Sequence, residues 1–206
     1  MLYAFTRRGS LVERAEILAG HDVPADAFWL DLFEPGADEV ARVEAALEVS
    51  LPSREEMKEI EPSSRLYLEG GGVYITTTVL NRADDPNPSA DPITFVLSHQ
   101  RLVTLRHVDP RPVATYAARI SRQPHACSGA EDALVGLLEA FIDRFADILE
   151  RVSLDLDQTS RAIFDATPSR PGDDREEADG PRDGQQALAR GRGEVVVARE
   201  GLQHRL

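Results

Sequence analysis

Apolar residues recur with alternating spacings of four and three between residues 134 and 152. The row consists of Leu134, Leu138, Phe141, Phe145, Ile148 and Val152. This spacing keeps all six side chains on one face of a helix. Helical character continues to Phe164, which gives a helix of about 50 Å at 1.5 Å per residue. Because an average helix has only about 12 residues, we expect this one to project beyond its own domain and its apolar row to require a partner.

The two ends of this helix are marked in the sequence. Ser128 and Glu131 have the spacing of a capping box, which predicts the start of the helix. After Pro168 the composition changes, and Ser169–Leu206 is rich in charged residues, Gly and Pro. Such a segment buries too little apolar surface to fold alone. We therefore predict an α/β domain over residues 1–125, the long amphipathic helix over 128–166, and a disordered or aberrant tail over 169–206.

Short strands and helices precede the long helix. Runs of β-branched and aromatic residues predict six strands: Leu2–Arg7, Phe28–Leu32, Leu66–Leu68, Val73–Leu80, Pro92–Ser98 and Arg101–Val108. Helical spacing and caps predict helices after Pro35, over Arg54–Ile60 with a Ser53–Glu56 capping box, and over Pro112–Ser121. The segment Asp84–Asp91 is expected to be a loop. The predicted fold class is α+β, with a mixed sheet covered by helices and a long projecting amphipathic helix.

The overall composition excludes several classes of function. The formal net charge is −13, which argues against nucleic acid as a partner because phosphate binding needs clustered Lys and Arg. Cys127 is the single cysteine, so no intramolecular disulfide forms. No apolar run reaches the roughly 20 residues that a membrane span requires. Arg7 and Arg8 follow the first apolar stretch, which is the wrong order for a secretory signal. We expect a cytoplasmic chain.

Few residue groups in the sequence suggest chemistry. Glu55, Glu56 and Glu59 could gather Mg²⁺, which needs only one or two carboxylates and retains water; the alternative is a solvated helix face. His125 and Cys127 do not complete a zinc site. The remaining histidines are not accompanied by a nucleophile motif. The sequence therefore predicts that the chain is not an enzyme.

Several segments occur in an order that resembles a known family. Trp29–Leu32 is followed by a short amphipathic helix, then by Leu51–Arg65, a hairpin and a long acidic helix. This order resembles the intracellular N-terminal domain of the CorA family of magnesium and cobalt transporters, which includes the zinc-transporting ZntB branch. The most specific parts are Lys58–Ile60, Ser64–Arg65 and Leu134–Leu156. The family's pore signature, Gly-Met-Asn, does not occur in this sequence.

The resemblance implies both an architecture and a site. In the family this domain is an αβα sandwich, and it forms a funnel in a homopentamer whose membrane spans follow it. Members sense divalent ions through carboxylates at the subunit interface. Glu59 aligns with the acidic sensing residue, and Glu56 lies one turn away. The usual partner of this residue is on a stalk helix that the sequence lacks, so binding of Mg²⁺, or of Co²⁺ or Zn²⁺, is expected to be weak and regulatory.

Two functions remain open from the sequence. The first is the cytoplasmic regulatory domain of a CorA-like magnesium transporter of the inner membrane, without the pore in this chain. Membrane contact would then come only through C-terminal spans, and a loss of reading frame near Pro168 would explain their absence. The second is a stand-alone soluble module that oligomerises through the row Leu134–Val152.

Overall fold

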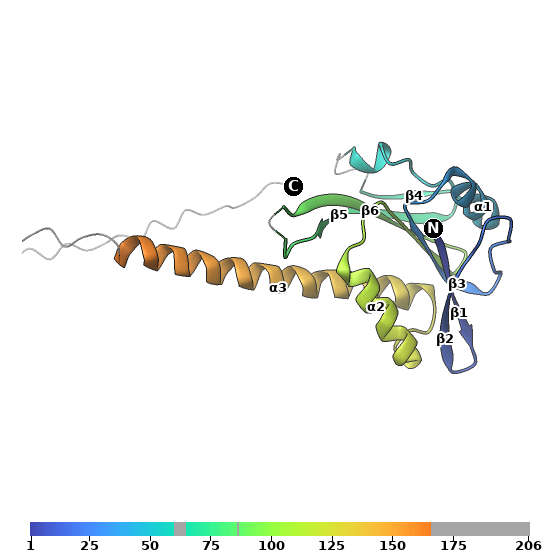
Figure 1. Cartoon of the computed structure of the whole chain (residues 1–206). Coiled ribbons are helices and arrows are strands. Elements are labelled where there is room, and N and C mark those ends of the chain that lie inside the picture. The colour runs from blue at the N-terminus through green and yellow to red at the C-terminus, as the bar shows by residue number, and fades with distance from the viewer. Residues whose placement is uncertain (60–64, 86, 166–206) are drawn as a thin grey trace, which may run out of the picture. The chain divides into compact units, whose positions relative to one another are not determined.

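The computed structural model describes residues 1–59, 65–85 and 87–165, and Met1–Phe164 form one compact unit. Its strands are β1 (Leu2–Arg8), β2 (Leu11–Glu16), β3 (Ala27–Phe33), β4 (Leu66–Glu69), β5 (Gly72–Asn81), β6 (Ser89–Ser98) and β7 (Arg101–Arg106). Its helices are α1 (Ala37–Leu47), α2 (Arg111–Arg122) and α3 (Ala130–Asp165), with single 3₁₀ turns η1 (Glu56–Lys58) and η3 (Pro124–Ala126). Figure 1 shows the helices arranged around one sheet.

All seven strands form one mixed sheet in the order β2-β1-β3-β7-β6-β5-β4. Neighbouring strands run antiparallel except at the centre, where β3 and β7 pair in parallel. Six of the seven residues of β3 are buried, as expected for a strand covered on both faces. The predicted α+β class with a mixed sheet between helices is confirmed.

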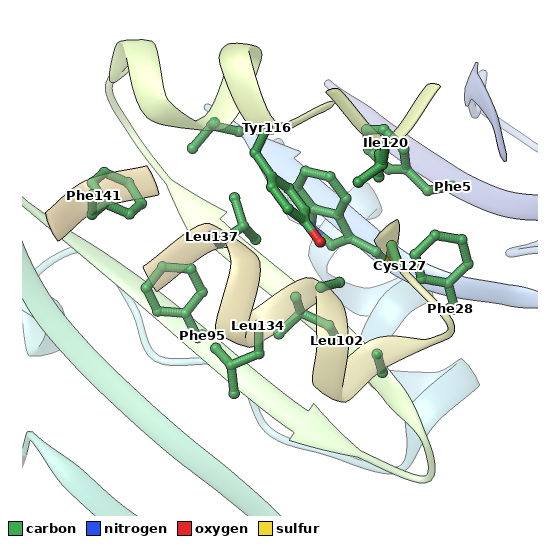
Figure 2. Packing of buried hydrophobic residues seen from close by; sticks show 14 of the residues in the cluster. Phe5, Phe28, Phe95, Leu102, Tyr116, Ile120, Cys127, Leu134, Leu137 and Phe141 are labelled. Atoms are coloured by element: carbon green, nitrogen blue, oxygen red, sulfur yellow. The ribbon is translucent and has the colours of Figure 1, made fainter. Parts of the chain in front are cut away.

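The helices α2 and α3 cover one face of the sheet (Figure 2). Leu137 and Phe141 of α3 pack with Phe95 of the sheet and Tyr116 of α2 in one buried cluster. The Phe95 and Phe141 rings meet edge to face with centroids 6.2 Å apart. Trp29 belongs to the same cluster, so this face contains much of the aromatic core.

The opposite face of the sheet is covered by α1 and η1. Val43 and Leu47 of α1 pack with Met57 of η1 and with Tyr74 and Val96 of the sheet. The sheet therefore separates two cores, and helices close both of them.

A buried ion pair joins the two parallel central strands. The Arg106 guanidinium donates two hydrogen bonds of 2.9 Å to Asp31, and both side chains are almost fully buried. Burial by itself lowers the pKa of Arg106, but the hydrogen bonds and charges of Asp31 and Asp109 outweigh it and raise that pKa. Thr104 also donates to Asp31 at 2.6 Å. Because the charges are matched and hydrogen-bonded, the pair is compatible with the interior.

Two local predictions require correction, and one strand was missed. The strand β2 was not predicted, because only Val12 of its six residues is buried and it carries no clear alternation. The predicted loop Asp84–Asp91 is shorter, since β6 already begins at Ser89. At the start of α3, the Ser128 backbone N–H donates to Asp132 at 2.8 Å, so Asp132 takes the capping role predicted for Glu131.

The apolar row on α3 is only partly available to an external partner. Leu134, Phe141 and Ile148 are buried, and Leu138 and Phe145 pack against the same core. Val152, by contrast, is 46% exposed. The row as far as Phe145 packs in the chain's own core, and Ile148 is also buried. A module that oligomerises through Leu134–Val152 would therefore have to use a different surface.

Other sequence predictions concern membrane spans or residues outside the described ranges. Within residues 1–59, 65–85 and 87–165, no helix is long and apolar enough to cross a membrane. The predicted tail over 169–206 lies outside the described residues, as do Ile60 and Ser64. The division into residues 1–125, 128–166 and 169–206 stays a prediction.

Candidate metal-binding site

The turn η1 contains the predicted carboxylate Glu56, and Glu59 follows the turn directly. The Ser53 backbone N–H donates to the Glu56 carboxylate at 2.8 Å, and the Glu56 N–H donates to the Ser53 hydroxyl at 3.2 Å. The predicted capping box is therefore confirmed. The predicted helix Arg54–Ile60 is wrong in length, because only Glu56–Lys58 are helical and Glu59 is extended. Met57 anchors the turn, since its side chain is 3% exposed in the core beneath α1.

Glu56 and Glu59 line one hollow of about 500 Å³ beside η1. Glu69, at the end of β4, lines the same hollow. The remaining walls are Ser50, Leu51, Pro52, Met57, Tyr67 and Thr76. Glu55 is exposed on the same turn but does not line the hollow. The structure thus places Glu56 and Glu59 beside the same hollow and adds a third carboxylate, Glu69; their role in binding a metal stays a prediction.

Burial, hydrogen bonds and neighbouring charges shift the pKa values of two groups beside the hollow. Tyr67 stacks on Tyr74 with ring centroids 4.7 Å apart. Burial raises the pKa of Tyr67 most, and Tyr74 and the charges of Glu69 and Glu56 raise it further. Hydrogen bonds from Ser53 lower the pKa of Glu56. Glu56 is therefore ionised at neutral pH and contributes a full negative charge to the hollow.

The donor set suits a hydrated hard cation rather than a tightly held one. Among the described residues, no three His, Cys, Asp or Glu side chains converge closely enough to hold a metal ion. One oxygen of Glu56 already accepts the Ser53 N–H. Mg²⁺ binds through one or two carboxylates while keeping several waters. Glu56, Glu59 and Glu69 are the carboxylates that a hydrated ion in this hollow would meet, and they do not form a complete protein cage.

Sequence reasoning missed Glu69 because β4 has an unexpected orientation. Leu66 and Leu68 are 64% and 79% exposed, whereas Tyr67 is half-buried and stacks on Tyr74. Side chains alternate along a strand, so Glu69 lies on the same side as Tyr67, towards η1. If the leucines of β4 pointed into the core, Glu69 would face away from η1. The pairing of Tyr67 with Tyr74 shows that β4 has the other orientation.

The acidic loop between β5 and β6 contacts the long helix α3. Asp84 accepts hydrogen bonds from Arg144, at 2.7 Å, and from Arg151. These two arginines lower the pKa of Asp84 to about 2. Since the arginines belong to α3, this carboxylate fastens the long helix to the sheet.

Comparison with known proteins identifies the family. Residues 24–174 match the family model described as "CorA-like Mg2+ transporter protein". The chain belongs to this CorA-like family. The resemblance found in the sequence is therefore confirmed, and the family is one of transporters rather than enzymes.

Relatives of known sequence give the same family at moderate identity. The chain is 30% identical over 178 residues to "Magnesium transport protein CorA" of Escherichia coli K12, and the same values hold for the protein of that name from Salmonella typhimurium. The aligned region is 86% of this chain but 55% of those relatives. The chain thus spans about half the length of the curated relatives it matches.

Solved structures of the family share the fold. The soluble domain of CorA from Methanocaldococcus jannaschii superposes with a TM-score of 0.61 and 15% identity, over 79% of this chain and 64% of that one. The ZntB cytoplasmic domain from Vibrio parahaemolyticus gives a TM-score of 0.50 and 14% identity, over 72% of this chain and 62% of that one. The sheet and long helix are therefore those of the CorA soluble domain.

Proposed function

We propose that this chain is the cytoplasmic regulatory domain of a CorA-like magnesium transporter and that it senses Mg²⁺ through Glu59 and Glu56. The observation that carries the proposal is the hollow beside η1, where both carboxylates lie with Glu69. The family match and the name of the E. coli relative make Mg²⁺ the expected ion. Co²⁺ and Zn²⁺ are the alternatives, but carboxylate oxygens favour the harder Mg²⁺.

The mechanism is electrostatic and involves no covalent step. Glu56, Glu59 and Glu69 repel one another and repel the carboxylates of a neighbouring subunit. A hydrated Mg²⁺ held by Glu59 would offset this repulsion and favour the closed arrangement of subunits. When Mg²⁺ is scarce the repulsion returns and the closed arrangement becomes less populated, which is a shift between existing states.

This mechanism requires self-association in the whole protein. We propose a homopentamer, with the pore and the inner-membrane spans supplied outside the described residues. One carboxylate pair per subunit binds Mg²⁺ weakly, so the closed state needs sites on several subunits to respond over a narrow concentration range. The ligand set would then be completed between subunits.

The test is thermal unfolding of the full chain in increasing MgCl₂, with NaCl of equal ionic strength as the reference because salt itself screens charge. A ligand that binds only the folded state raises the melting temperature. We expect a rise of about 3–6 °C at tenfold excess over the Kd, because such binding adds about 1.4 kcal/mol of stability to a chain of this size. Glu59→Gln should abolish the rise.

Two matched variants separate the site from general acidity. Glu55→Gln removes the same charge from the same turn but outside the hollow, and it should keep the full Mg²⁺ response. Glu56→Gln preserves the capping box, because Gln also serves at that position, and it should reduce the response without loss of basal stability. An identical rise in wild-type, Glu59→Gln and Glu55→Gln proteins would remove the site from the account.

A further inference from the structure

A hollow of about 260 Å³, which we call the α2–α3 hollow, is lined only by residues of these two helices. Both helices cover the face of the sheet opposite to η1, so this hollow is separate from the proposed metal site. The helices approach most closely at Gly136, where an added Cβ would lie 2.3 Å from the Tyr116 ring. Figure 1 shows α2 and α3 crossing at an angle, and the hollow lies beside this crossing, where the small Ala140 lines it.

The two walls of the α2–α3 hollow carry opposite charges. The α2 wall contains Arg111 and Arg119, with Thr115 between them, and the α3 wall contains Asp143 and Asp147. Residues four positions apart lie on one face of a helix, so each helix directs its two like charges to the same side. All four charged side chains are exposed, which leaves them accessible to a ligand.

No ion pair among the described residues joins the two walls. Arg111 has its ion pair with Asp84, at 4.0 Å, and the Arg119 guanidinium lies over the Tyr116 ring, 5.0 Å from its centroid. Arg144 also lines the hollow, but its charge is matched by Asp84 at 2.7 Å. Two positive charges on α2 and two negative charges on α3 therefore face the hollow without neutralising one another directly.

This arrangement disfavours a ligand of a single charge sign. An anion at the arginines of α2 would be repelled by Asp143 and Asp147. A metal ion at those aspartates would be repelled by the arginines, and no three metal-binding side chains converge within the described parts of the chain. A molecule with both a carboxylate and an ammonium group matches both walls, because guanidinium groups bind carboxylates in a bidentate manner and an ammonium group donates up to three hydrogen bonds.

The size and the apolar lining of the hollow restrict the ligand further. Its volume is below the about 300–1,000 Å³ that is typical of pockets for drug-sized ligands, so it suits a small metabolite. Pro112, Tyr116 and Ala140 provide apolar surface between the charged residues, which suits a hydrocarbon body. Because the opposite charges belong to different helices, the two charged groups of the ligand are expected at opposite ends of that body.

We propose that the α2–α3 hollow binds a small zwitterion of the ω-amino carboxylate class. Its carboxylate accepts hydrogen bonds from Arg111 and Arg119, and its ammonium group donates to Asp143 and Asp147. Such a ligand links α2 to the long helix beside their closest contact. The domain would then respond to a small organic molecule independently of Mg²⁺.

The test measures the affinity of the full chain for four small probes in buffer that contains EDTA. The probes are 6-aminohexanoate, hexanoate, hexylammonium, and norleucine, which has the formula of 6-aminohexanoate but carries both charges on one carbon. Amide chemical shifts report binding and its location. We expect 6-aminohexanoate to bind about tenfold more tightly than each other probe, because the others leave one wall without its hydrogen bonds. Its shifts should fall in residues 111–119 and 140–147.

Substitutions assign each end of the ligand to its wall. Arg111→Gln with Arg119→Gln should lower the affinity for 6-aminohexanoate to that for hexylammonium, because the carboxylate then has no partner. Asp143→Asn with Asp147→Asn should lower it to that for hexanoate. All four side chains are exposed, so both double variants should fold, and circular dichroism checks this.

Two control variants remove the same charges from the same helices outside the hollow. Arg122→Gln and Glu150→Gln should change the affinity less than about twofold, since the effect of distant exposed charges is screened. Equal affinity for the four probes, equal losses from the hollow and control variants, or shifts confined to other residues would each overturn the proposal. Because these measurements contain no Mg²⁺, either outcome leaves the proposed sensing site to its own test.

Discussion

The two halves of α3 have the same heptad spacing but different surroundings. In the first half, Leu137 is fully buried, and Phe141 and Ile148 are 5% and 9% exposed. In the second half, Val152, the next member of the same apolar row, is 46% exposed, and Leu156 is 64% exposed. The spacing specifies which side chains share a face of the helix, but the extent of the sheet determines which of them are covered. Figure 1 shows α3 continuing past the strands.

A single loop marks the boundary between the halves. Asp84, between β5 and β6, binds Arg144 in the covered half and Arg151 in the exposed half. Beyond Arg151 the structure shows no ion pair from α3 to the sheet among the described residues. We therefore treat the covered half as part of the domain core and the exposed half as lying outside it.

The largest expected difference comes from truncating one leucine in each half. Leu137→Ala should lower the free energy of unfolding by about 2–5 kcal/mol, because it leaves a cavity in the core. Leu156→Ala should change it by less than about 0.5 kcal/mol, as is usual at exposed positions. Urea unfolding followed by the fluorescence of Trp29, the single tryptophan, measures both. Equal losses would show that the far half is also packed.

A substitution that adds a methyl group should also affect the two halves of α3 differently. A Cβ at Gly136 would lie 2.3 Å from Cε2 of the buried Tyr116 ring. Gly136→Ala should therefore cost about 1–3 kcal/mol through overpacking, although alanine is by itself the better helix former. Ser153→Ala, in the exposed half, should be neutral or slightly stabilising. The melting temperatures of the two variants provide the comparison, and a stabilised Gly136→Ala protein would contradict the described packing.

The smallest expected effect is the pH dependence of the boundary contact. The pKa of Asp84 is lowered from 3.8 to about 2 in the folded chain. A depressed pKa contributes stability that is present above pH 3.8 and is lost as the pH falls towards 2. Asp84→Asn should therefore have a lower urea midpoint than wild type at pH 6, and the two midpoints should converge near pH 2. A constant difference over that range would assign the effect to something other than the charge.

Much of the fold could be predicted from local patterns. The strands β5, β6 and β7 follow from their β-branched runs, and the capping box at Ser53 follows from its spacing. The edge strand β2 could not be predicted, because only Val12 among its residues is buried and its sequence therefore lacks the alternation that identifies a strand. The burial of the apolar row to Ile148 also required the structure, since spacing does not reveal a partner.

Only those residues of the candidate site that are close together in the sequence could be predicted. Glu56 and Glu59 lie on one turn, so their proximity follows from the sequence. Glu69 joins them through strand pairing, which depends on the register of β4 with β5. The pairing of Asp31 with Arg106 has the same origin, because it depends on the register of two strands about 75 residues apart.

Hydrogen exchange along α3 in the full chain most directly tests the division of the helix. Amides between residues 133 and 148 should exchange only through opening of the domain, whereas those between 152 and 163 should exchange faster through local fraying. Uniform protection along the whole helix would contradict the account.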